Sequence, residues 1–230
     1  MRKKESLGRC VAAFGLALAV LALPAVSTAQ LGVQLPTLPP SPVGGLLSGS
    51  SPSTGMAQTV VGQAAAVRIT ILGLLGGTTT SLADTGTLGG INDARDAAAI
   101  AGSVPSALTG EVLNAATMSW SDQVDSVASL ANLNMTIAGI GITADSVMAE
   151  ASQVAGAAGS GTSTFSNLVI NGVSVPVTGA PNQAIWIPGG LVTINEQNIS
   201  STGTAVVNAL HVAVTGVADV VIASATAGIS

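Results

Sequence analysis

Residues 168–175 read LVINGVSV, in which two short apolar runs flank the dipeptide Asn171-Gly172. Asn-Gly accepts positive φ at both central positions of a tight two-residue turn, the geometry that joins neighbouring antiparallel strands. Val and Ile on both sides favour extended backbone. The stretch therefore predicts a β-hairpin, and it is the most specific fold signal in the chain.

Three further stretches have the same texture, with Val, Ile and Thr in short runs between Gly, Asn, Asp and Pro. They are residues 130–147, residues 184–194 with a turn at Pro188-Gly-Gly190, and residues 207–224 with a turn near Thr215-Gly216. Four consecutive hairpins predict an all-β domain, an antiparallel β-sandwich or barrel built from hairpins.

Two other patterns leave alternatives open. Residues 93–116 contain Ala-rich pieces that favour one short helix ending near Gly102, although glycines and a proline interrupt it. A short Asn-Leu pattern opens several apolar strands at unequal spacings, which keeps a β-solenoid as the alternative architecture. Its copies are Asn132-Leu133, Asn167-Leu168 and Asn208-Ala-Leu210. The prediction is thus all-β, with at most one short helix.

The N-terminus has the pattern of a signal peptide, residues 1–29. Basic residues precede an apolar run of 13 residues, Val11 to Leu23, and small residues follow at Ser27 and Ala29. We expect cleavage near Ala29. The run is shorter than the roughly 20 residues that cross a bilayer, so no transmembrane span is expected in the mature chain.

Beyond the leader the chain divides in two. Residues 30–55 are rich in Pro, Gly and Ser without an apolar period, and they predict a flexible tether. Residues 56–230 are long enough for a sizeable core and are expected to form a single β domain.

The composition of the mature chain argues against catalysis. It holds one His, no Cys and no Tyr, and two arginines against ten acidic residues, a net charge of −8. Catalytic and metal chemistry need imidazoles, thiols or clustered carboxylates. Nucleic acid is bound chiefly through Lys and Arg. We therefore expect that the protein is not an enzyme, that it needs no cofactor and that it has no nucleic-acid partner.

His211 is the single imidazole. Strict alternation along a strand places it on one face with Val207 and Ala209, and places Asn208 on the other face. Glu196 is its best partner if the strand containing that residue lies alongside. A structural zinc site usually combines four Cys or His ligands, so no metal site is expected. We expect a structural histidine bonded to Asn, Gln or Glu neighbours, with a functional His–Glu pair as the alternative.

Trp120 and Trp186 are the candidate binding residues. Exposed indoles stack on sugar rings, whereas Trp186 between Ile185 and Ile187 also suits a core position. Since aromatic residues are so few, we expect at least one of the two tryptophans to be in the core.

Residues 164–229 resemble the C-terminal half of the choice-of-anchor P family of exported bacterial proteins, and the likeness extends over roughly residues 57–230. The most specific residues are Asn195, Glu196, Gln197, Asn208 and His211. The resemblance implies a shared surface domain accompanied by varied attachment signals, and it implies no biochemical activity. No sorting motif or hydrophobic tail precedes Ser230, so release or noncovalent retention is expected.

Together these features predict an exported, noncatalytic cell-surface or extracellular protein with a structural or assembly role. A carbohydrate- or cell-envelope-binding module is the alternative. The expected partners are envelope polysaccharide or other surface proteins, and further copies of this chain that pair through exposed sheet edges.

Overall fold

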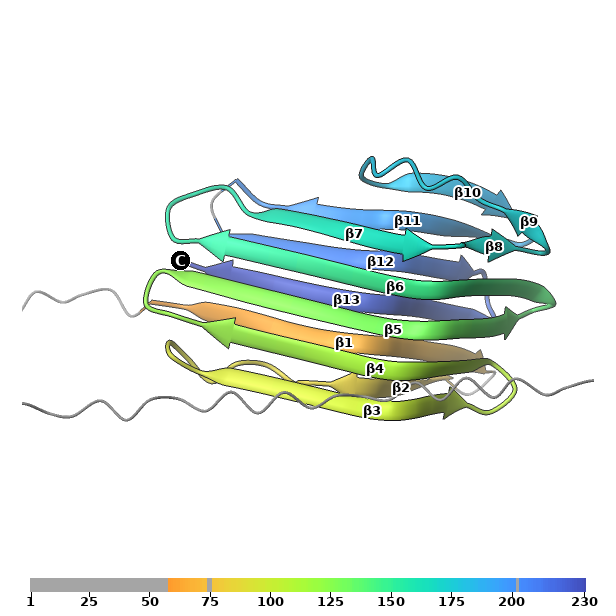
Figure 1. Ribbon diagram of the computed structural model, residues 1–230, viewed down its shortest axis with the longest axis horizontal. Helices are drawn as coiled ribbons and strands as arrows, with labels where there is room; N and C mark the ends of the chain where they lie inside the picture. Colours follow the sequence, from red (N-terminus) through yellow and green to blue (C-terminus); the bar gives the residue numbers. More distant parts are fainter. Residues whose placement is uncertain (1–57, 74–75, 202) are drawn as a thin grey trace, which may run out of the picture. The chain divides into compact units, whose positions relative to one another are not determined.

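Short β-branched and Ala-rich runs between turn residues fold into two antiparallel β-sheets that pack face to face (Figure 1). The structure is a computed structural model that describes residues 58–73, 76–201 and 203–230. The expected signal peptide and tether lie outside these residues. Of the architectures predicted from sequence, the β-sandwich is confirmed.

The described residues form thirteen strands and no helix. The strands are β1 (Val60–Gly73), β2 (Gly76–Asp84), β3 (Ala94–Val104), β4 (Leu108–Ser119), β5 (Gln123–Ile137), β6 (Ile140–Val154), β7 (Ser160–Ser166), β8 (Val169–Ile170), β9 (Val173–Ser174), β10 (Gln183–Ile187), β11 (Gly190–Ile199), β12 (Thr204–Val214) and β13 (Ala218–Ile229).

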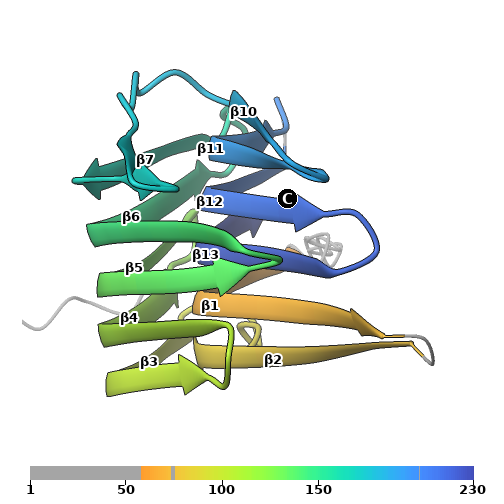
Figure 2. The same ribbon diagram turned by 90° about the vertical axis from the view of Figure 1, so that its right-hand side faces the viewer.

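Sheet A has the order β10-β11-β12-β13-β1-β2, and sheet B has the order β3-β4-β5-β6-β8-β9, with β7 also paired to β6 (Figure 2). The N-terminal strand β1 pairs with the C-terminal strand β13, so the two ends of the domain share one sheet. Every strand pair is antiparallel, which makes the β-solenoid alternative wrong. No helix in the described part of the chain is long and apolar enough to cross a membrane.

The hairpin predicted at residues 168–175 is formed by β8 and β9. Ile170 pairs with Val173, and Asn171 and Gly172 have φ of 49° and 77°, as a two-residue turn of this type requires. The other three predicted hairpins are confirmed as β5–β6, β10–β11 and β12–β13. Local turn chemistry therefore fixed each of these connections.

The short helix expected within residues 93–116 is wrong, because this stretch forms most of the β3–β4 hairpin. Ala has a high helix propensity, but tertiary packing overrides it here. Leu113 is fully buried against sheet A, and a Cβ at Gly102 would press on its side chain. The small side chains of the Ala-rich stretch therefore leave room for the side chain of Leu113 to pack.

The core lies between the two sheets and combines many alanines with a few large side chains. Gly161 in β7 shows how closely the sheets approach, since a Cβ there would overlap the side chain of Val207 in β12. The side-chain amide of Gln197 crosses the gap and donates to the carbonyl of Gly161 at 3.0 Å. Small residues thus allow direct polar contacts between sheets.

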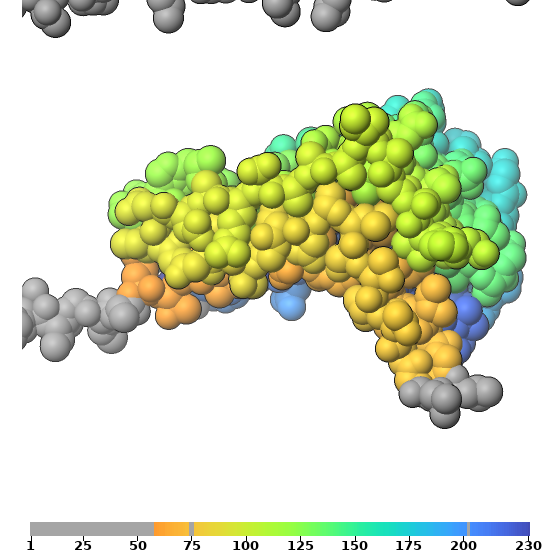
Figure 3. All heavy atoms as spheres, turned by 90° about the horizontal axis from the view of Figure 1, so that it is seen from below, coloured from red at the N-terminus to blue at the C-terminus, as the bar shows by residue number. Residues whose placement is uncertain are grey.

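Each sheet bends along a line that crosses its central strands. At this line the alternation of inward-facing and outward-facing side chains is interrupted. In sheet A successive residues are buried in each central strand: residues 64–67 in β1, Ala209 and Leu210 in β12, and residues 222–225 in β13. In sheet B two successive residues point outward: Glu111-Val112, Ala131-Asn132 and Asp145-Ser146. Sheet B is therefore longer on its outer face, and the sandwich is arched in profile (Figure 3).

The bend corrects the predicted faces of β12. Val207 and Ala209 point into the core with Leu210 and Val212, whereas His211 points outward. Asn208 also lies on the outer face, three residues before His211. Strict alternation failed because the strand changes phase at the bend.

Candidate functional site

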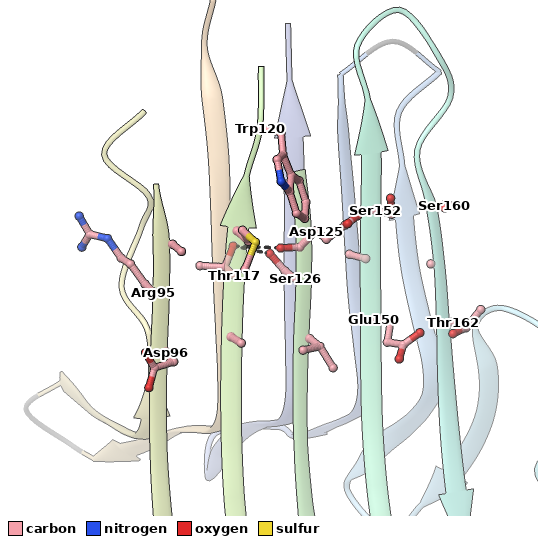
Figure 4. A pocket seen from close by; sticks show the side chains of 16 residues that line it. Arg95, Asp96, Thr117, Trp120, Asp125, Ser126, Glu150, Ser152, Ser160 and Thr162 are labelled. Carbon is pink, nitrogen blue, oxygen red and sulfur yellow. Dashed lines mark hydrogen bonds between the residues drawn. The ribbon is translucent and has the colours of Figure 1, made fainter. Parts of the chain in front are cut away.

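A groove crosses five strands on the outer face of sheet B (Figure 4). Two neighbouring rows of paired residues line it, each following the strand order β3 to β7. The first row is Ala94, Met118, Asp125, Ser152 and Ser160, and the second is Asp96, Ala116, Val127, Glu150 and Thr162. Neighbouring strands lie about 4.8 Å apart, so each row is about 19 Å long. An extended molecule lying across the strands would follow the rows.

The hollow arises from the size of the side chains that face outward. Ala94 and Ala116 leave the floor low, whereas Met118, Val127 and Glu150 rise around them. The cavity has a volume of about 570 Å³. This is within the range of roughly 300–1,000 Å³ that is typical of small-molecule sites.

Trp120 stands beside Asp125 at the groove (Figure 4). It follows the last residue of β4, and its backbone N–H donates to the carbonyl of Gln123 at 2.8 Å, which closes the turn into β5. The side chain is 42% exposed. A tight turn thus holds a large apolar ring at the edge of the groove without burying it.

The polar groups of the groove are of two kinds. Asp125 is held in place, because the amide of Gln123 donates to both of its carboxylate oxygens at 2.9 and 2.8 Å. In contrast, several lining side chains have no hydrogen-bond partner among the described residues: Asp96, Glu150, Ser160 and Thr162. One carboxylate is pre-oriented, and the other polar groups are free to bond a ligand.

Trp186 lies elsewhere. It is on β10 at the edge of sheet A, where it pairs with Leu191, and it is 83% exposed. Its neighbours Ile185 and Ile187 pack against the core instead. The expectation that at least one tryptophan is in the core is therefore wrong, and the two indoles do not share a site.

The outer face of sheet A carries a hydrogen-bonded network around His211. Its Nδ1 lies 3.0 Å from Glu196 Oε1, and its Nε2 lies 3.0 Å from Asp219 Oδ2. Asn208 donates to the other oxygen of Glu196 at 2.6 Å, and Ser224 donates to Asn208 at 2.7 Å. The predicted contact of His211 with Glu196 is confirmed, whereas Asp219 was missed.

This network shifts the titration of the histidine. Burial acts to lower the pKa of His211, but the hydrogen bonds to Asp219 and Glu196 and their negative charges outweigh it, so the pKa lies above its ordinary value. Both ring nitrogens face carboxylates, and the protonated ring can donate to each. The arrangement is that of a histidine clamped by its neighbours.

Asn195 and Gln197 belong to the interior, not to this network. Asn195 is buried, donates to the carbonyl of Gly179 at 3.0 Å and accepts from Gln197 at 2.9 Å. Gln197 in turn donates to Gly161 across the sandwich. Asn195 and Gln197 thus tie loops and sheets together, while Glu196 between them faces outward.

Sequence reasoning found Trp120 but not the groove beside it. The lining residues come from strands between residues 94 and 162, and only the pairing register brings them into rows. A weak signal exists in the alternation of Asp125 with Val127 and of Glu150 with Ser152. No group of three or more His, Cys, Asp or Glu in the described residues is placed to hold a metal ion.

Comparison of the chain with protein-family models, with curated proteins and with solved structures gives no match.

Proposed function

We propose that this protein is an exported, noncatalytic carbohydrate-binding module whose ligand lies in the sheet B groove. One observation carries the proposal: the exposed indole of Trp120 borders a groove lined by free hydroxyl and carboxylate groups. A sugar ring presents an apolar face and a rim of hydroxyls, so it needs an aromatic surface with polar partners beside it.

The position of His211 supports the noncatalytic part of the proposal, and the hydrolysis assay below tests the carboxylates of the groove. The imidazole lies on the outer face of sheet A, engaged by Glu196 and Asp219. The groove lies on sheet B and has no histidine in its lining. No general acid or base with an ordinary pKa near neutrality therefore faces the proposed ligand.

Binding is tested with the purified protein and a panel of polysaccharides. Insoluble polymers are used in pull-down series, and soluble oligosaccharides are titrated by calorimetry. We expect saturable binding to at least one of them, with no shortening of the bound oligosaccharide after long incubation. Absence of binding to every member would contradict the binding module, and release of shorter products would contradict its noncatalytic character.

Export is the second part of the proposal, and it rests on the pattern of residues 1–29 and on the resemblance to the choice-of-anchor P family. The test is fractionation of the producing cells followed by N-terminal sequencing of the protein. We expect a mature form outside the cytoplasm that begins near Gln30. A full-length chain retained in the cytoplasm would overturn this part alone.

A structural or assembly role is the second candidate, and the free edge of sheet B favours it. Strand β3 is the last strand at that edge, and Ile100 on it is 90% exposed. Long, apolar edge strands are the ones that pair with another chain. Light scattering over a concentration series tests this role, since a monomer at every concentration would contradict it and a concentration-dependent oligomer would support it.

A further inference from the structure

The negative charges of the groove are not neutralised by the protein. Asp96, Asp125 and Glu150 face outward from β3, β5 and β6. Among the described residues there are two basic side chains with permanent charge, Arg68 and Arg95, and no lysine. Any ligand in the groove therefore lies near three negatively charged carboxylates.

Neither arginine compensates these carboxylates. Arg95 is itself among the residues that line the groove, but its Nε is paired with Asp93 at 3.2 Å, and its guanidinium points away from the groove (Figure 4). Arg68 is on β1 of sheet A, where it pairs with Asp84 at 3.3 Å. Each arginine is thus held by a carboxylate outside the groove.

The carboxylates are spread along the groove instead of being gathered at one point. Glu150 is opposite Thr162, Asp125 is opposite Ser152, and Asp96 is opposite Ala116. A hydroxyl on the neighbouring strand accompanies two of the three. This alternation suits a polymer that repeats both hydroxyl and cationic groups, and not a single metal ion.

We propose that the groove selects polysaccharides of amino sugars whose ammonium groups are free, over neutral and acidic polysaccharides. This inference rests on the proposed carbohydrate-binding function. Ammonium groups form charge-assisted hydrogen bonds with carboxylates, and they are also attracted to the face of an indole such as that of Trp120. Uronic acid or phosphate groups are repelled from the same surface.

The test compares three soluble oligomers of equal length: β-1,4-linked glucosamine, its N-acetylated form and a galacturonic acid oligomer. One charge-assisted hydrogen bond gives roughly tenfold or more in affinity, so we expect the glucosamine oligomer to bind at least about tenfold more tightly than the N-acetylated one. The galacturonic acid oligomer should bind most weakly. The preference should fall at high salt and when the pH is raised until the amines lose their charge.

Glu150→Gln and Asp96→Asn locate the effect. Each should reduce the preference for the free amine severalfold while leaving the affinity for the N-acetylated oligomer nearly unchanged. The matched control is Asp145→Asn, which removes one exposed carboxylate from the same strand as Glu150 but outside the groove. The control should keep the preference of the wild type.

The possible outcomes distinguish charge selection from the carbohydrate-binding function on which it rests. If both glucosamine oligomers bind equally and Trp120→Ala abolishes binding, charge selection is overturned and the binding module stands. If Asp145→Asn reduces the preference as much as Glu150→Gln, the effect comes from net charge and the groove assignment is overturned. If no oligosaccharide binds in either series, both proposals are overturned.

Discussion

The outer faces of both sheets carry a glutamate, but one glutamate is hydrogen-bonded to protein side chains and the other is not. On sheet A the carboxylate of Glu196 is bonded to both Asn208 and His211. On sheet B the carboxylate of Glu150 has no hydrogen-bond partner among the described residues. Each glutamate lies within a long strand on a solvent-facing surface. The difference is whether the protein itself provides the partners.

The contrast separates polar groups that hold the fold from polar groups that can serve a ligand. A satisfied network stabilises the native state, and a ligand would have to break it to bind there. The carboxylate of Glu150 has no hydrogen-bond partner in the described part of the protein, so a ligand can bond to it without breaking a contact within the fold. We therefore propose that recognition occurs on sheet B and that the His211 network has a structural role.

The largest expected effect is the loss of carbohydrate binding in Trp120→Ala. Truncation of a central aromatic residue in a binding site costs about 2–4 kcal/mol of binding free energy. The dissociation constant should rise by at least about thirtyfold. Because the indole is already 42% exposed, the free energy of unfolding should fall by about 1 kcal/mol or less. Calorimetric titration and chemical denaturation measure the two quantities.

Trp186→Ala is the matched control for that variant, since it removes the other exposed indole from the opposite sheet. It should leave both affinity and stability close to those of the wild type. Equal loss of affinity in the two variants would show that recognition is not confined to the groove, and the comparison of the two faces would fail.

A smaller effect, on stability instead of binding, is expected for Glu196→Ala. The change leaves Asn208 and one nitrogen of His211 without their partner, and a hydrogen bond of this kind contributes about 1 kcal/mol. Glu150→Ala removes the same side chain from sheet B, where it has no protein partner, and should leave the free energy of unfolding unchanged. Denaturant titration of both variants decides this, and equal stability losses would contradict it.

The parts of the fold that the sequence predicted are those set by local turn chemistry. Asn171-Gly172 and the turn at Pro188 were recognised because two-residue turns need particular residues at particular positions. The short helix expected within residues 93–116 was wrong because alanine favours a helix locally, while burial of Leu113 against the other sheet favours a strand.

The candidate site was less predictable, because it depends on register between distant strands. Trp120 was singled out by the scarcity of aromatic residues, but Glu150 and Thr162 join the same groove only through pairing of β5, β6 and β7. The bend hid a second feature, since strict alternation put Asn208 and His211 on opposite faces. No Gly or Asn stands at Ala209, where β12 changes phase, so its sequence did not mark the position.

The smallest expected effect is a pH dependence of stability that belongs to sheet A alone. The pKa of His211 is raised in the folded state by Asp219 and Glu196, so folding favours the protonated ring. This stabilisation is complete below the unfolded pKa of about 6.5, and it is lost as the pH rises through the higher folded value. Because the side chain is partly exposed, the loss should be below about 1 kcal/mol.

The measurement is the free energy of unfolding from pH 5.5 to 8.5 for the wild type and for His211→Gln. The wild type should lose stability across this range, whereas the glutamine variant, which can bond the same neighbours without titrating, should show a flatter profile. Affinity for a neutral oligosaccharide should not follow the same curve, because the groove contains no histidine. A binding curve that follows the titration of His211 would mean that the two faces are coupled through the thin Ala-rich core, and their roles could then no longer be separated.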